Sequence, residues 1–235
     1  ATGFYSTSED LCRYFSAQLI GSNKLLNDES KKEMQRIQFN TVSSKKDNNN
    51  GYGLGLELEY INDKKTIGHG GGFPGYITRS IIDINGELVI TVLTNCLGGS
   101  AGEIAKGIHG IINYFQNNFI AKKSKHNLTK FEGHYMALTS NVDIVVIGEN
   151  IVSVHRDTWR PFDSSNGIEE LEYVDNKTLK ITRANSFSSE GELVHFNTKK
   201  GEKDFIIYAG KTMWPAEYWF KKQNERQKVE LRNSK

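Results

Sequence analysis

The most unusual segment of the chain runs from His69 to Tyr76 and reads His-Gly-Gly-Gly-Phe-Pro-Gly-Tyr. Glycines lack side chains, so their backbone amides can come within reach of a substrate carbonyl, while an imidazole offers a hydrogen bond or a positive charge near neutral pH. A purely structural explanation is also open, because glycine permits positive φ and Pro74-Gly75 makes a tight turn without any ligand. The segment is therefore a candidate site for chemistry at a carbonyl group.

The surroundings of this segment resemble a known family. Four pieces, in this order and at these intervals, are similar to the C-terminal half of the serine β-lactamase-like catalytic domain: ATGFYSTSEDLCRYF, YGLGLELE, IGHGGGFPGY and ELVITVLTN. Class C β-lactamases, penicillin-binding proteins with DD-peptidase activity and D-amino-acid peptidases share that domain. The resemblance covers roughly residues 1 to 119.

The resemblance implies roles for individual residues. Family members bring together three motifs: Ser-x-x-Lys with the acylating serine, Tyr-x-Asn with a proton-transfer tyrosine, and Lys-Thr-Gly or His-x-Gly on the facing strand. His69-Gly70-Gly71 matches the third motif, so His69 would assist proton movement or engage a substrate carboxylate. The amide of Gly72 would be one of two oxyanion-hole donors. The substrate-binding residues implied by the match are Gly70, Gly71, Phe73 and Tyr76.

One match to each of the other motifs occurs in the chain, and we reject both. The run Ser43-Ser44-Lys45-Lys46 lies in a polar loop, whereas the family serine opens a buried helix where desolvation can lower the pKa of the lysine. Tyr60-Ile61-Asn62 ends a strand only a few residues before His69, whereas the family tyrosine faces that strand across a cleft. We therefore expect the reactive serine, lysine and tyrosine to lie before Ala1.

The chain is accordingly expected to be a C-terminal piece of a bacterial serine hydrolase that works through an acyl-enzyme, and to be inactive alone. Histidine in place of lysine favours a D-amino-acid peptidase or esterase over a β-lactamase. The alternative is a non-catalytic binding module, either a ligand-carrying barrel or a degenerate relative that recognises cell-wall peptide. The resemblance implies a location outside the cytoplasm or at the cell envelope.

The elements that must position these residues follow from hydrophobic periodicity. We expect helices at 6–20, opened by a Ser6/Glu9 capping box, at 28–37, capped by Asn27 or Asp28, and from Ser100 to Phe119. Strands are expected at 52–60, 66–71, 76–84 and 87–94, the last two joined at Asn85-Gly86. Residues 1–121 thus predict an antiparallel sheet with flanking helices, part of a β-lactamase/transpeptidase-like domain.

The remainder of the chain predicts a different architecture. After a linker at 122–130, about eight short strands between 131 and 222 favour a small closed barrel, and 223–235 is expected to be a charged tail. Phe131-Glu132-Gly133-His134-Tyr135 resembles the opening of the lipocalin-like barrel that follows the catalytic domain in some family members. The fold class is therefore α+β. Five aromatic residues are expected in the barrel core and rim: Trp159, Tyr208, Trp214, Tyr218 and Trp219.

Composition narrows the possible partners. With 30 basic and 28 acidic residues, the chain has no electrostatic footprint for nucleic acid. We expect neither a metal ion nor a cofactor, because the histidines other than His69 show no metal-ligand spacing. Cys12 and Cys96 are predicted to be buried free thiols. The expected partners are a small-molecule or peptide substrate, the rest of the catalytic domain, and a second copy of the chain through exposed apolar faces.

Overall fold

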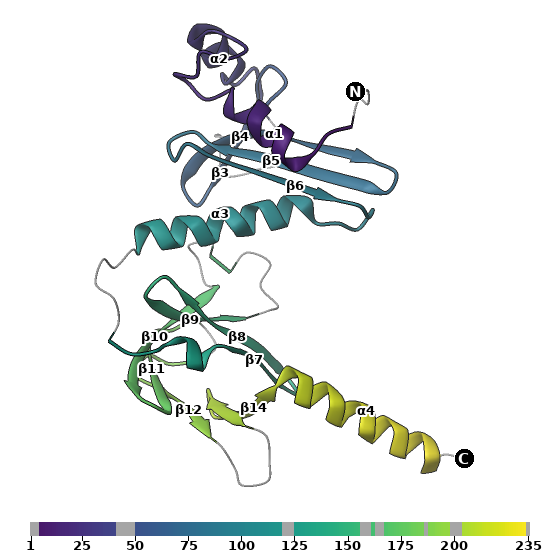
Figure 1. Cartoon of the computed structure of the whole chain (residues 1–235), viewed down its shortest axis with the longest axis vertical. Helices are drawn as coiled ribbons and strands as arrows, with labels where there is room; N and C mark the ends of the chain where they lie inside the picture. The colour runs from purple at the N-terminus through teal and green to yellow at the C-terminus, as the bar shows by residue number, and fades with distance from the viewer. Residues whose placement is uncertain are drawn as a thin grey trace. The chain divides into compact units, whose positions relative to one another are not determined.

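The computed structural model describes residues 5–40, 50–118, 125–155, 161–162, 167–185, 188–197 and 204–233. The chain divides into two compact units, Ala1–Asn113 and Tyr114–Lys235. Figure 1 shows a mixed α and β structure. The fold class is therefore α+β, as predicted.

The described part of the first unit forms a six-stranded antiparallel sheet in the order β1-β2-β3-β4-β5-β6. Its strands are β1 (Phe39–Asn40), β2 (Gly51–Tyr52), β3 (Glu57–Ile61), β4 (Lys64–Phe73), β5 (Tyr76–Asp83) and β6 (Leu88–Thr94). The helices are α1 (Ser8–Ser16), α2 (Asp28–Met34) and α3 (Ala101–Asn117), of which residues 101–113 belong to this unit. Helices α1 and α3 lie on opposite faces of the sheet (Figure 1).

The two faces follow from the alternation of side chains along the strands. Ile67 and Ile82 point to one face, where they pack with Phe15 of α1. Ile81 and Ile90 point to the other face, where they pack with Ala105 of α3. Each helix thus buries one apolar side of the same sheet.

Helix starts are set by local hydrogen bonds. The predicted Ser6/Glu9 capping box is wrong, because the N-cap of α1 is Thr7, whose hydroxyl accepts a hydrogen bond from the Asp10 amide. Asn27 caps α2 as one of the two predicted residues, accepting from the Ser30 amide.

The single predicted strand at 52–60 is wrong, because it breaks after Tyr52 and resumes at Glu57. Gly53 and Gly55 explain the break. A Cβ at Gly53 would lie 2.1 Å from the Met34 carbonyl oxygen, and Gly55 has φ of +71°. Leu54 is consequently exposed instead of facing the core.

The hairpin between β5 and β6 forms as predicted, but its turn differs from the expectation. Asp83 pairs with Leu88, so the loop holds four residues and the positive φ falls on Glu87, at +50°. The Gly86 amide donates to an Asp83 carboxylate oxygen at 2.9 Å. The loop is therefore fixed by a carboxylate and not by the Asn85-Gly86 pair alone.

The described part of the second unit forms a closed antiparallel barrel of eight strands, in the order β10-β11-β12-β13-β14-β7-β8-β9. The strands are β7 (Gly133–Ala137), β8 (Ser140–Ile147), β9 (Asn150–His155), β10 (Ile168–Asp175), β11 (Thr178–Arg183), β12 (Leu193–Asn197), β13 (Phe205–Tyr208) and β14 (Lys211–Pro215). A short 3₁₀ helix, η1 (Thr129–Phe131), places Phe131 against the barrel core. The predicted barrel is confirmed.

The C-terminal residues differ from the prediction. The last strand ends at Pro215, before the expected end of the barrel at residue 222, and α4 (Ala216–Asn233) occupies most of the expected charged tail. Proline has no N–H with which to extend a strand ladder, and the following Lys, Glu, Gln and Arg residues are good helix formers. The charge run is therefore the surface of a helix.

The structure also bears on the cysteines, on metal-binding clusters and on membrane-spanning helices. Cys96 is exposed and Cys12 is half-buried, so the prediction of two buried thiols is wrong. The described residues contain no group of three or more His, Cys, Asp or Glu side chains that could hold a metal ion. Among the same residues, no helix combines the length and the apolar character needed to cross a membrane.

Candidate functional site

The glycine-rich segment forms the tip of the β4–β5 hairpin. Phe73 pairs with Tyr76 across the two-residue turn Pro74-Gly75, and Gly75 has φ of +88°. A turn with proline followed by a positive-φ glycine is the type II pattern. Phe73 and Tyr76 are 59% and 58% exposed, so two aromatic rings flank the turn in contact with solvent.

His69 lies on β4 and pairs with Ser80 of β5. It is half-buried, and both of its ring nitrogens have partners. The Tyr52 hydroxyl lies 2.8 Å from Nε2, and the Gly70 carbonyl oxygen lies 2.5 Å from Nδ1. The rings of Tyr52 and His69 meet edge to face, with centroids 5.8 Å apart. Tyr52 is thus a further residue of the candidate site, and no motif in the sequence points to it.

The glycines of the segment differ in how far the fold itself requires them. A Cβ at Gly68 would lie 2.0 Å from the Ser80 carbonyl oxygen, and one at Gly71 would lie 2.7 Å from the Thr78 hydroxyl oxygen. At Gly70 and Gly72 the nearest atoms would be 3.5 Å away, which is ordinary contact. Packing within the chain therefore explains glycine at 68 but not at 70 or 72.

The opposite face of the same strands holds an ion-pair network. Because side chains alternate, Arg79 points away from the face of its neighbour Ser80 and hence of His69. Its guanidinium pairs with the carboxylates of Glu57 and Glu59, and Lys106 of α3 lies 2.7 Å from Glu59. Burial opposes the charge on Arg79, but Glu59 and Glu57 outweigh it and raise the pKa of the guanidinium. This network belongs to the face covered by α3.

The two rejected motifs have different outcomes. Tyr60 is 47% exposed, and Asn62 and Asp63 form the turn between β3 and β4, with φ of +51° and +60°. Tyr60-Ile61-Asn62 is therefore the end of a hairpin. The run from Ser43 to Lys46 lies outside the described residues.

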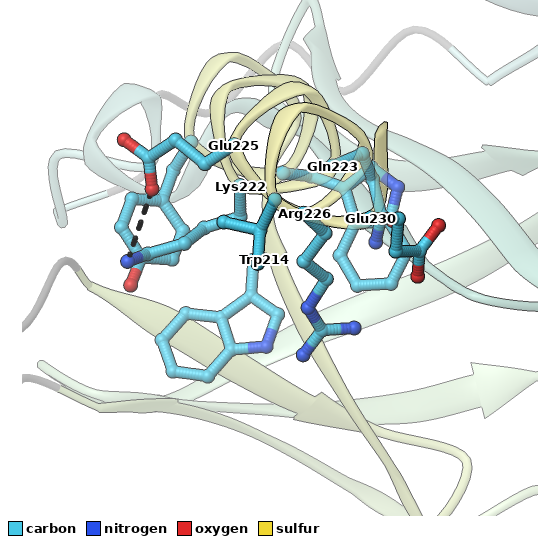
Figure 2. A pocket seen from close by; sticks show the side chains of 9 residues that line it. Trp214, Lys222, Gln223, Glu225, Arg226 and Glu230 are labelled. Carbon is cyan, nitrogen blue, oxygen red and sulfur yellow. Dashed lines mark ion pairs between the residues drawn. The ribbon is translucent and has the colours of Figure 1, made fainter. Parts of the chain in front are cut away.

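A groove of about 800 Å³ lies in the second unit, beside α4 (Figure 2). It is lined by Trp214, Tyr218, Trp219, Lys222, Gln223, Glu225, Arg226, Val229 and Glu230. Lys222 and Glu225 form an ion pair of 3.5 Å along its edge. None of the predicted site residues lines this groove. Tyr208 lies in the barrel core, the other three described aromatics are half-buried, and Trp159 lies outside the described residues.

Comparison with known proteins gives the class of the first unit. Residues 1–109 match the family model described as Beta-lactamase. This stretch contains α1, the whole sheet and the His69 segment. Over this stretch the first unit is therefore similar to the Beta-lactamase family.

A search of curated proteins found no match. Among solved structures, the octameric penicillin-binding protein homologue from Pyrococcus abyssi is 18% identical with a TM-score of 0.43, over 88% of this chain and 46% of that chain. The crystal structure of SurE is 14% identical with a TM-score of 0.37, over 89% of this chain and 48% of that chain. The crystal structure of SurE with D-Leu is 14% identical with a TM-score of 0.35, over 88% of this chain and 49% of that chain. This chain spans somewhat less than half of each of these structures.

Proposed function

We propose that this chain is the C-terminal part of a bacterial serine hydrolase, a D-amino-acid peptidase or esterase that works through an acyl-enzyme. The single observation that supports the proposal most is the end of β4. There an imidazole is followed by exposed backbone at Gly71 and Gly72, and packing within the chain does not require glycine at 70 or 72. A backbone without side chains lets a substrate carbonyl approach the amides closely.

The chemistry proposed is a two-step acyl transfer. A serine hydroxyl from a segment preceding residue 1 attacks the carbonyl carbon of an amide or ester and gives its proton to a neighbouring base. The tetrahedral oxyanion accepts hydrogen bonds from the Gly72 amide and from the amide of that serine. The C–N or C–O bond then breaks, the leaving group takes a proton, and water hydrolyses the resulting ester by the same route. His69 takes part in the proton movement.

The family alternatives are ranked by the residue at position 69. A lysine would be positively charged near neutral pH and would bind the carboxylate of a β-lactam strongly, whereas a histidine can be neutral there. This favours peptides and esters over β-lactams as substrates. We also propose a location outside the cytoplasm or at the cell envelope, and association of copies through exposed apolar faces.

Covalent labelling tests the proposal. We expect a fluorescent fluorophosphonate or penicillin to label the longer protein encoded by the gene, and to leave residues 1–235 unlabelled. Labelling of residues 1–235 alone would contradict the proposal that the nucleophile lies upstream and would return attention to Ser43. An intact longer protein that neither reagent labels would favour a non-catalytic binding module.

A further inference from the structure

The surroundings of His69 determine which of its two ring nitrogens carries the proton when the ring is neutral. A carbonyl oxygen can only accept a hydrogen bond, so the 2.5 Å contact with the Gly70 oxygen requires the proton on Nδ1. The lone pair is then on Nε2, and the Tyr52 hydroxyl at 2.8 Å must be the donor. The neutral ring thus has no nitrogen left to face a substrate.

Tyr52 is held in place by its own backbone. The Gln38 amide donates to the Tyr52 carbonyl oxygen at 2.8 Å, and the Gly53 amide donates to the Leu56 carbonyl oxygen at 2.7 Å. The glycines on both sides are required by close contacts. A Cβ at Gly51 would lie 2.7 Å from a methyl carbon of Ile37, and one at Gly53 would lie 2.1 Å from the Met34 carbonyl oxygen. The close packing of Gly51 and Gly53 therefore fixes the backbone position of Tyr52 between them.

We propose that Tyr52 is a further catalytic residue and that it acts as a pair with His69. The hydroxyl proton of Tyr52 is directed to Nε2, and no described residue donates to the Tyr52 oxygen, whose lone pairs remain able to accept. The pair therefore presents an acceptor to a substrate N–H or O–H group. This rests on the proposed function and decides between the two roles open to His69, because an acceptor takes a proton and repels a carboxylate.

The proposed proton transfer consists of two linked movements, so that Tyr52 loses one proton and gains another. A proton moves from the reacting O–H or N–H group to the Tyr52 oxygen, while the original hydroxyl proton of Tyr52 moves to Nε2. The products are the deprotonated reacting group, an unchanged neutral tyrosine and an imidazolium at His69. The reverse sequence returns the proton to a leaving group.

Nuclear magnetic resonance of residues 1–235 with ¹⁵N-labelled histidine tests this directly. We expect the neutral His69 ring to be predominantly the Nδ1–H tautomer, with the resonance assigned by its loss in His69→Gln. In Tyr52→Phe the preference is expected to be lost. Tyr60→Phe is the matched control, because it removes an exposed hydroxyl from the neighbouring strand, and it should leave the tautomer unchanged.

Two results would overturn the proposal: a predominant Nε2–H tautomer in the unsubstituted chain, or an unchanged tautomer in a folded Tyr52→Phe variant. The tautomer of the unsubstituted chain is measured without any variant, so it tests the proposal even if Tyr52→Phe does not fold. The measurement also needs no activity. A longer protein that resists labelling would overturn the proposed function while leaving the Tyr52–His69 geometry intact, so the two failures can be told apart.

Discussion

Gly68 and Gly72 are four positions apart on one strand, yet their missing side chains serve different purposes. Gly68 lets β4 and β5 approach, because a Cβ there would overlap the Ser80 carbonyl oxygen. Gly72 is exposed and has room for a methyl group. The fold needs the first glycine, whereas the packing of the chain places no such requirement on the second.

Alanine substitution separates the two purposes. Gly68→Ala is expected to destabilise residues 1–235 by at least about 1–3 kcal/mol, because a backbone atom blocks the methyl group. Gly72→Ala is expected to leave the melting temperature unchanged or slightly raised, because alanine is less flexible than glycine when unfolded. Thermal melts of both variants check this. Equal destabilisation would mean that Gly72 is also a packing residue.

We expect Asp83 to make the stability of the first unit sensitive to acid. Its carboxylate is only 2% exposed and contacts the Gly86 amide at 2.9 Å, His109 at 3.2 Å and Lys64 at 3.3 Å. Burial opposes its charge, but these partners together lower the pKa of the carboxyl. A lowered pKa gives stability that is fully present above the ordinary value of about 3.9 and is lost as the pH falls through the lowered value.

Asp83→Asn tests this linkage. We expect the variant to be less stable near neutral pH, since Lys64 and His109 lose a charged partner, and its stability to fall less between about pH 5 and pH 2. Urea unfolding over that range measures both effects. Asp63→Asn, at an exposed turn with φ of +60°, is the control and should keep the acid dependence of the unsubstituted chain. If the free energy of unfolding of Asp83→Asn fell with acid as steeply as that of the unsubstituted chain, the Asp83 carboxylate would be excluded as the cause of the acid dependence.

At the scale of elements, β3 and α3 are joined by charge as well as by apolar packing. Glu59 forms ion pairs with both Arg79 and Lys106, and these three side chains are largely buried. Removing one carboxylate would leave two cations without their shared partner. Such a network costs more to break than a surface ion pair.

We expect Glu59→Gln to reduce the free energy of unfolding of the first unit by about 1.5–3 kcal/mol, the range for hydrogen bonds to charged groups. Glu33→Gln removes the exposed pair with Arg36 on α2 and should have little effect. Denaturant titration of both variants gives the comparison. A Glu59→Gln variant as stable as Glu33→Gln would show that α3 is held by its apolar face alone.

Much of the strand pattern could be predicted from the sequence, because alternating apolar residues and turn residues report local preferences. One error arises where a distant contact decides, because Met34 crowds Gly53 and splits the predicted strand. Another is local, because Pro215 ends β14 before the helical run of α4. In the site, His69 and the glycines are visible as an unusual segment. Tyr52 is not, because only the register of the folded sheet brings it to His69, 17 residues away.

At the scale of the whole molecule, the chain combines a β-lactamase-like sheet unit and a closed barrel. The barrel has its own core, in which Phe131, Tyr208 and Met213 are almost completely buried. Tyr114, the first residue of the second unit, packs with Val152 and Ile168 of that unit. A unit with its own hydrophobic core is expected to fold independently.

A polypeptide of residues 114–235 is therefore expected to unfold in one cooperative transition. Its far-ultraviolet circular dichroism should show β structure together with the contribution of α4. Replacing Met213 by Ala, which opens a cavity in the core, should lower the stability by about 2–5 kcal/mol. A gradual, non-cooperative melt of the unsubstituted polypeptide would contradict an independent barrel.

We propose that the end of β4 is one wall of an acyl-transfer site. The most direct measurement is the rate of covalent acylation of the longer protein after His69→Ala, taken together with its melting temperature. We predict a decrease in rate of about 10²-fold or more, typical of a lost proton-transfer group, with no loss of stability. His134→Ala, at a half-buried histidine of the barrel that contacts Asn141 at 2.7 Å, should leave the rate unchanged. An unchanged acylation rate in His69→Ala, or a decrease explained by unfolding, would show that His69 and the end of β4 take no part in acyl transfer.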